Sequence, residues 1–148
     1  MQRFDVIILG GGLVGLTLGI ALGRHGVTSA IIDPAEPATT MAPGFDGRVS
    51  AISSASWKLF EAIGVAPHLQ GRCCPIDRIW VSEGLTGGAL DFAPDPDDGA
   101  MGFMVENREL RRAIDAAAQA ADGITRFQPD KAADVVRDAY GVTVRLAS

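Results

Sequence analysis

The sequence contains few of the residues that form disulfides or bind polyanions. Only two of the 148 residues are cysteine, and because Cys73 and Cys74 are adjacent they do not easily form an unstrained bridge that staples the fold. A reducing, cytoplasmic setting is therefore expected. The 13 Lys and Arg residues are scattered along the chain and are outnumbered by 18 Asp and Glu residues. A chain with a net charge of -5 and no basic cluster is not expected to bind nucleic acid.

Side chains that bind metal ions are equally sparse. His25 lies near the end of the first expected helix, where a surface role suits it, and His68 has no carboxylate or second histidine at ligand spacing. The acidic stretch 95–98, with Glu106 further on, is only faintly similar to a calcium loop. Its glycine is one position early and its fifth position offers no oxygen side chain. We therefore predict no metal site.

What the chain does have is a long apolar run near its start. From Val6 to Gly23 no residue is charged, over a length that is typical of a membrane span. The pair Gly15 and Gly19 also fits the GxxxG pattern of packed membrane helices. Against an anchor, Asp5 stands where the apolar block should begin, and glycine is frequent within the block. The alternative is a nucleotide-binding turn.

The same run divides into parts with different periods. Residues 4–9 are apolar and β-branched, as in a strand buried on both faces of a parallel sheet. A glycine-rich turn follows over 10–15 and leads into a helix with apolar residues at spacings of three and four. A second strand over 28–33 ends in a carboxylate. Strand, turn, helix, strand and terminal acid form the βαβ dinucleotide fingerprint.

Each position of the fingerprint has a physical task. Gly10 allows a tight exit from the strand, Gly12 lets a pyrophosphate approach the backbone, and Gly15 lets the helix lie close to the strand. The helix N-terminus offers unpaired N–H groups and a partial positive charge to the diphosphate. Asp33 can accept hydrogen bonds from the adenosine ribose and would repel a 2'-phosphate, which favours FAD or NAD over NADP. The cofactor-binding residues expected here are Gly10, Gly12, Leu13, Val14, Gly15 and Asp33.

The fingerprint alone does not name an enzyme, because a glycine-rich helix can also pack on a sheet without a ligand. Three later stretches add to it: DGRVSAISSASWKLFEAIGV over 46–65, IDRIWVSEG over 76–84 and MGFMVENRELRRAI over 101–114. Together with the fingerprint, in this order, they resemble the flavin-dependent aromatic hydroxylases of ubiquinone biosynthesis, the polyprenyl-methoxyphenol hydroxylase family. The resemblance covers residues 4–146.

The resemblance implies an α/β fold: a glutathione-reductase-like, FAD-binding Rossmann domain with a parallel sheet, and the beginning of a β-rich substrate domain. We expect the FAD-binding βαβ unit and a following helix over 1–72, the start of the substrate-domain sheet over 73–104, and a return to the FAD domain over 105–148. The family continues further, with an Asp-Gly and a Gly-Asp motif that have no equivalent here. The chain is therefore expected to be the N-terminal, truncated part of a longer enzyme.

The resemblance also implies a function. It is an FAD-dependent monooxygenase that hydroxylates a prenylated phenol, with NAD(P)H as a transient reductant and O2 as co-substrate. Because the cofactor carries the chemistry, no catalytic residue is expected in this part. A soluble enzyme with peripheral contact at the inner membrane is implied, while the oligomeric state is not predicted. The isolated chain is expected to bind FAD poorly and to be inactive. The alternatives are an NAD-dependent dehydrogenase and a non-catalytic nucleotide-binding module.

Two arginines are further candidates for cofactor contacts. In the family the arginine of the 46–65 stretch lies near the flavin, which gives that role to Arg48; otherwise Arg48 is a solvated cation of a glycine-flanked loop. Arg108 falls in the first turn of the helix expected after Asn107, which would be its N-cap. A cation is unfavourable at a positive helix start, so a bound anion would explain it. The resemblance suggests the FAD diphosphate or ribityl chain.

The remaining segments predict local structure. The stretch 51–64 is expected to be a helix that buries Ile52, Ala55, Leu59 and Ile63 on one face. Ser50 and Ser53 are expected to cap it, since no base is placed to activate either hydroxyl.

Two hairpins are also expected, one from the strands around 76–84 and 88–94 and one with its turn at 138–141. The aromatic side chains of the first, Trp80 and Phe92, are interpreted as core residues, with substrate-pocket walls as the alternative.

Overall fold

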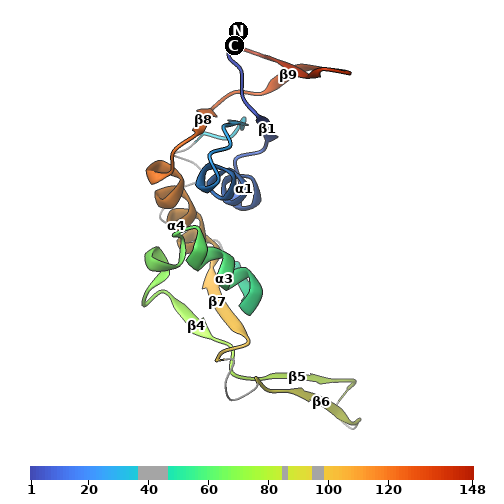
Figure 1. Ribbon diagram of the computed structural model, residues 1–148. Helices are drawn as coiled ribbons and strands as arrows, with labels where there is room; N and C mark the ends of the chain where they lie inside the picture. The colour runs from blue at the N-terminus through green and yellow to red at the C-terminus, as the bar shows by residue number, and fades with distance from the viewer. Residues whose placement is uncertain (37–46, 85–86, 95–98) are drawn as a thin grey trace.

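The computed structural model describes residues 1–36, 47–84, 87–94 and 99–148 (Figure 1). One part of the structure is a parallel three-stranded sheet with the strand order β1-β2-β8. Each neighbouring pair is in register along its whole length, so that Ile8 lies beside Ile31 and Ile31 beside Arg126. The three strands are β1 (Val6–Leu9), β2 (Ser29–Ile32) and β8 (Ile124–Phe127).

Two helices, α1 (Leu13–Arg24) and α4 (Asn107–Ala120), pack on one face of this sheet (Figure 1). Apolar side chains of the sheet and both helices form the core, because apolar area removed from water stabilises the fold by about 25 cal/mol per Å². A Cβ atom built on Gly19 would lie 2.8 Å from Ile31 Cδ1, so glycine lets α1 approach the sheet closely. The most buried members of the whole core cluster are Ile20, Ile31, Val65, Leu69, Val105 and Ile114.

The apolar run at the start of the chain is therefore not an anchor. It divides into β1, a glycine turn and a helix of 12 residues. Within the part of the chain that the structure describes, no helix combines the length and the apolar character that a bilayer span requires. The membrane-anchor interpretation is wrong, and the strand–turn–helix–strand prediction is confirmed.

A second sheet is antiparallel and has the order β3-β7-β4. It joins the helices without connecting loops: β3 passes directly into α3 (Ser54–Ala62), and β7 passes directly into α4. A short 3-10 helix, η1 (Ala66–Leu69), follows α3. The strands of this sheet are β3 (Val49–Ser53), β4 (Cys73–Pro75) and β7 (Gly102–Glu106).

The strand β3 was not expected, and it shortens the predicted helix. Ile52 pairs with Phe103 of β7 in place of lying on a helix. Ser53 does cap α3, since its side chain accepts a hydrogen bond from the Ser56 N–H. Leu59 is 43% exposed, whereas Ile63 is buried.

The buried face of α3 is therefore turned relative to the prediction. Ala55 is exposed, and the buried side chain of the helix is Phe60. Trp57 packs against Phe103, with ring centroids 4.0 Å apart. Trp57 and Phe60 are three positions apart and share a face of the helix, and packing selects this face in place of the one with Ala55 and Leu59.

Two antiparallel hairpins complete the described structure. The turn of β9 (Ala132–Asp138) and β10 (Gly141–Leu146) falls where predicted. The strands β5 (Ile79–Ser82) and β6 (Ala89–Phe92) pair as expected, but every residue of both is exposed.

The aromatic residues of the β5–β6 hairpin are not core residues. Trp80 is 71% exposed and Phe92 is 47% exposed. The hairpin projects from the end of the molecule opposite to β9 (Figure 1), which leaves both of its faces without cover from the helices. The interpretation as core is therefore wrong.

The predicted division at residues 72 and 104 stays a prediction. The antiparallel sheet takes β3 from the first predicted segment and β4 from the second, and β7 crosses the boundary between the second and the third.

Candidate functional site: the glycine turn and two arginines

The glycine turn after β1 is shaped by contacts that only glycine permits. Gly10 has a φ of 109°, in the region that side chains disfavour, and its N–H donates to the Ile32 carbonyl at 2.8 Å. A Cβ on Gly15 would lie 1.8 Å from the Gly10 carbonyl oxygen. The first turn of α1 is thereby pressed against the end of β1, as predicted for the third glycine of the fingerprint.

Space remains open above this turn. Among the described residues, a Cβ built on Gly12 would meet nothing within 4 Å, and the same holds for Gly10. Gly12 is the N-cap of α1 and supplies no side-chain hydrogen bond, and the first turn of the helix contains no acidic residue. The side chain of Val14, in that first turn, is 83% exposed.

This geometry fits a diphosphate. The first N–H groups of a helix have no partner within the helix and carry a partial positive charge. Here no capping side chain covers them, and two glycines leave room for an anion to reach the backbone. Of the predicted residues, Leu13 begins the helix whose N–H groups would hold the group.

Asp33 stands directly after β2 and faces the turn. Its Oδ2 accepts a hydrogen bond from the Gly11 N–H at 2.5 Å, and its Oδ1 accepts one from the Ala35 N–H at 2.7 Å. The structure therefore brings the carboxylate and the glycine turn together, as the fingerprint predicts. The contact with Gly11 was not predicted, because the sequence pattern assigns the acid only to the ribose.

The two predicted arginines form a second group, at the junction of β3, β7 and α4. The carbonyl of Arg48, directly before β3, accepts a hydrogen bond from the Asn107 N–H at 3.1 Å. Arg108 is in the first turn of α4, and its Nε lies 2.8 Å from Glu106 Oε2 and 3.5 Å from Glu109 Oε1. Antiparallel pairing of β3 with β7 thus places Arg48 beside Asn107, the residue before Arg108.

Glu109 lies at the centre of a charged cluster at the start of α4. Its carboxylate contacts Arg72 and lies 3.1 Å from Arg112 Nη1. The hydrogen bond from Arg72 lowers the pKa of Glu109 most, against an opposing effect of burial, and the nearby charges of Arg112 and Arg108 lower it further. The carboxylate therefore stays ionised and holds the three guanidinium groups at this helix start.

Sequence reasoning missed the contact between Ser50 and Asn107. The Ser50 hydroxyl donates to Asn107 Oδ1 at 2.6 Å. Because this contact occupies the amide oxygen, Asn107 does not cap α4, and Glu106 is the N-cap instead. Ser50 likewise caps no helix, since it is a strand residue. Recognising β3 in the sequence would have been needed to find this pair.

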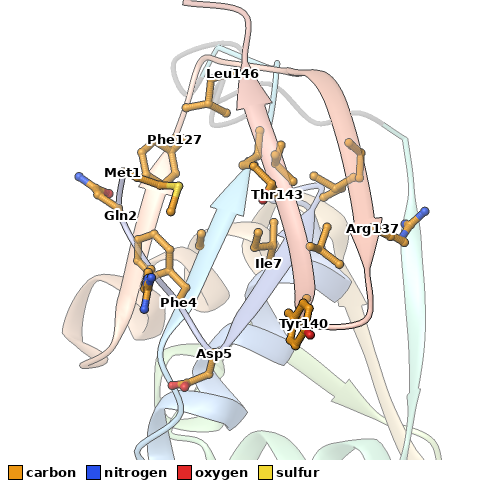
Figure 2. Close-up of a pocket in the computed structure, with 18 of the residues that line it drawn as sticks. Met1, Gln2, Phe4, Asp5, Ile7, Phe127, Arg137, Tyr140, Thr143 and Leu146 are labelled. Carbon is orange, nitrogen blue, oxygen red and sulfur yellow. The ribbon is translucent and has the colours of Figure 1, made fainter.

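A cavity lies elsewhere among the described residues, on the face of the parallel sheet opposite to α1 (Figure 2). It has a volume of about 970 Å³ between the sheet and the β9–β10 hairpin. Ile7, Leu9 and Phe127 line it, and Leu9 is 56% exposed. The expectation that β1 is buried on both faces is therefore met on one face only. The cavity contains none of the predicted cofactor residues.

Other candidate groups give no second site. His25 is the C-cap of α1, in keeping with its predicted surface role, and both cysteines are free. Among the described residues, no three His, Cys, Asp or Glu side chains gather as metal ligands would. The weak calcium-loop pattern over 95–98 lies outside the described residues.

Comparisons with known proteins identify the family of the chain. Residues 3–148 match the family described as FAD binding domain. Ubiquinone hydroxylase UbiL of Rhodospirillum rubrum is 41% identical over 143 residues, which are 97% of this chain and 33% of that protein. The 3-demethoxyubiquinol 3-hydroxylase of Escherichia coli is 36% identical over 130 residues, which are 86% of this chain and 33% of that protein. The chain thus spans about a third of the length of these curated relatives.

Solved structures show the same fold. A crystal structure of PqsL, a probable FAD-dependent monooxygenase from Pseudomonas aeruginosa, is similar over 99% of this chain and 39% of its own, with a TM-score of 0.75 and 22% identity. The flavin-dependent monooxygenase PieE, solved in complex with FAD and substrate, is similar over 98% of this chain and 27% of its own, with a TM-score of 0.70 and 20% identity.

The resemblance to the hydroxylases of ubiquinone biosynthesis and the FAD-binding Rossmann fold are both confirmed. The family match also favours FAD over the NAD-dependent dehydrogenase considered as an alternative. An open, uncapped helix start, an acid directly after β2 and a family match over nearly the whole length lead to one conclusion. This chain belongs to the FAD-binding domain family.

Proposed function

We propose that this chain is the cofactor-binding part of an FAD-dependent monooxygenase that hydroxylates a prenylated phenol in ubiquinone biosynthesis, with NAD(P)H as reductant and O2 as co-substrate. The observation that carries the proposal is the open, uncapped start of α1 beside Asp33, in a chain of the FAD-binding domain family. The names of the two ubiquinone hydroxylase relatives support the reaction and the substrate class.

Within this proposal the glycine turn holds the diphosphate of FAD. Backbone N–H groups of the turn and of the first turn of α1 donate to phosphate oxygens, which the positive end of the helix attracts. Asp33 accepts hydrogen bonds from the adenosine ribose hydroxyls, for which each carboxylate oxygen retains a second lone pair. The turn residues concerned are Gly10, Gly12, Leu13, Val14 and Gly15.

The arginines extend the cofactor site toward the other end of FAD. Arg48 places a positive charge near the flavin, and Arg108 contacts the diphosphate or the ribityl chain. Three guanidinium groups and two carboxylates meet at the start of α4, so an anion there offsets the remaining positive charge. When bound, FAD supplies the electron transfer to O2 that hydroxylation needs, while these residues bind and orient it.

The enzyme would take its prenylated phenol from a membrane and contact the inner membrane peripherally from the cytoplasm. The relatives named as ubiquinone hydroxylases support a substrate that carries a prenyl chain. This location rests on the substrate class rather than on a feature of the described residues.

A titration of the chain with FAD, followed by flavin fluorescence, tests the cofactor assignment. We expect weak but saturable binding by the isolated chain, weakened at least about tenfold further by Gly12→Val, because its side chain would fill the opening above the turn. Leu18→Ala is the matched control, since Leu18 is 46% exposed on the same helix beyond its first turn. Equal binding by the wild type and Gly12→Val, or tighter binding of NAD than of FAD, would refute the assignment.

A chimera tests the reaction. This chain replaces the matching third of Rhodospirillum rubrum UbiL, and ubiquinone is quantified in cells that lack the native hydroxylase. The expected result is restored ubiquinone with the chimera and a loss of it when the chimera carries Arg108→Ala. A folded, FAD-loaded chimera that restores no ubiquinone would contradict the proposed reaction while leaving the cofactor assignment intact.

A further inference from the structure

Asp33 makes more contacts with the backbone than a ribose-binding acid requires. Its two carboxylate oxygens accept hydrogen bonds from two different N–H groups, those of Gly11 and Ala35. Both bonds are made by the chain itself, with no nucleotide involved. Hydrogen bonds to an ionised carboxylate are among the stronger ones in proteins.

The backbone of Asp33 is itself held firmly. Its N–H donates to the Phe127 carbonyl at 3.1 Å, and its carbonyl accepts from the Asp130 N–H at 3.0 Å. Asp33 is thus fixed to β8 and to the segment after it. The carboxylate therefore reaches the turn from a rigid frame, so that its position can determine where Gly11 lies.

Gly11 is fitted to this contact. A Cβ on Gly11 would lie 3.1 Å from Asp33 Cβ and 3.3 Å from its Oδ2, closer than side chains normally pack. The space at Gly12 is different, since a Cβ there would meet nothing within 4 Å. Gly11 therefore faces the acid, while Gly12 faces the opening that the proposed function assigns to the diphosphate.

We propose that Asp33 is a positioning residue for the glycine turn: through the Gly11 N–H it holds the turn in its anion-binding shape before any nucleotide arrives. The proposal rests on the proposed function for the identity of the ligand, but the contact that carries it lies within the chain itself. It gives Asp33 a second role beside the ribose contact. The positioning role also explains why a carboxylate is present near the proposed diphosphate site, although the two negative charges repel each other.

The direction in which Asp33→Asn changes the affinity for pyrophosphate distinguishes a ribose-binding role from a positioning role. Inorganic pyrophosphate has no ribose, so an Asp33 that served only the ribose would not help it to bind. Removal of the negative charge in Asp33→Asn would then tighten pyrophosphate binding, because a repulsion is lost. If Asp33 positions the turn, the same substitution weakens pyrophosphate binding. The amide of the Asp33→Asn variant cannot accept from both N–H groups, since one end of an amide is an NH2 donor.

The matched control is Asp5→Asn, at the other end of β1. The Asp5 carboxylate accepts hydrogen bonds from the Thr28 N–H at 2.8 Å and from the Thr28 hydroxyl at 2.7 Å. It therefore ties the start of β1 to the residue before β2, much as Asp33 ties the turn to the end of β2. Asp5→Asn loses the same charge without touching the turn, and its amide oxygen can still accept both bonds because both go to Oδ2.

The experiment follows amide hydrogen exchange by NMR in the nucleotide-free chain and then titrates each variant with pyrophosphate. In Asp33→Asn and Asp33→Ala we expect exchange of the Gly11 amide to become about tenfold faster or more. The Gly10 amide, which donates to Ile32, should keep its protection and so report that the sheet is folded. Pyrophosphate should bind several-fold more weakly to both variants and unchanged to Asp5→Asn.

Unchanged exchange at Gly11 in a folded variant would overturn the inference, and so would equal or tighter pyrophosphate binding. Asp33→Asn keeps the volume of the side chain, so it remains informative if Asp33→Ala does not fold. Failure of the chimera with UbiL to bind FAD would refute the proposed function instead. The exchange rate of Gly11 would still decide the positioning role.

Discussion

The two faces of the parallel sheet differ in how they are covered. On one face α1 and α4 bury Ile8 and Ile31 in a continuous core. On the other face Leu9 is 56% exposed above a cavity that the β9–β10 hairpin only partly encloses (Figure 2). Ile8 and Leu9, two aliphatic residues that are adjacent in β1, thus lie in opposite environments, one buried and one exposed.

The comparison shows that stability and cofactor binding are arranged on one side of the sheet. The helices that provide the core also provide the two helix starts, those of α1 and α4, where the candidate cofactor residues lie. The open face contributes none of those residues. Substitutions on the two faces should therefore differ in both size and kind of effect.

The largest effect is expected at the contact between β1 and α1. Gly15→Val places a side chain where a Cβ alone would be 1.8 Å from the Gly10 carbonyl. The helix must move away from the strand, which we expect to lower the free energy of unfolding by about 3 kcal/mol or more and to abolish FAD binding. Urea unfolding and FAD titration measure the two effects. Near-native stability in Gly15→Val would show that the helix start is not fixed by this contact.

A cavity in the packed face should have the next largest effect. Ile31 is 1% exposed, so Ile31→Ala is expected to lower the free energy of unfolding by about 2–5 kcal/mol. If the two faces of the sheet differ as described, Ile31→Ala must lower the free energy of unfolding clearly more than Leu9→Ala does. Urea midpoints of the two variants, measured side by side, check the difference, and equal losses would remove the distinction between the faces.

The pH dependence of stability tests the helix-covered side of the sheet through Glu109 of α4. The hydrogen bond from Arg72 lowers the pKa of Glu109 from its ordinary value near 4.5, so the folded state favours the ionised form. Its contribution is complete above the ordinary pKa and is lost as the pH falls through the lowered value. We expect a drop in the urea midpoint below about pH 4.5 that is smaller in Glu109→Gln. An identical pH profile in that variant would exclude Glu109 as a source of acid sensitivity.

The smallest effect is expected on the open face. Leu9→Ala removes a side chain that is already more than half exposed, so the loss should stay below about 1 kcal/mol. FAD affinity should not change, because Leu9 precedes the turn and points toward the cavity. A loss similar to that of a core leucine would mean that this face is covered in solution.

The sequence predicted best where a local rule decides the structure. The glycine turn, the acid after β2 and the β9–β10 turn follow from glycine geometry and short spacing. The predictions failed where a distant partner decides. Val49–Ser53 forms a strand because it pairs with β7, about fifty residues away, and that pairing moves Ile52 out of the predicted helix.

The same distant pairing explains the site residues that were missed or misassigned. Ser50 bonds to Asn107 only because β3 and β7 are paired, and this takes the amide oxygen away from the expected cap. Trp80 and Phe92 are residue types that are common in core strands, but the local sequence does not indicate that their hairpin projects into solvent.

The direct passage of β7 into α4 has a mechanical consequence. Glu106 ends the strand and Asn107 begins the helix, so no linking residue is left over to act as a hinge. A rotation of the antiparallel sheet must carry the first turn of α4 with it, and with that turn Arg108. If the exposed β5–β6 hairpin tilts and the antiparallel sheet tilts with it, Arg108 would therefore be displaced together with the sheet as one rigid body.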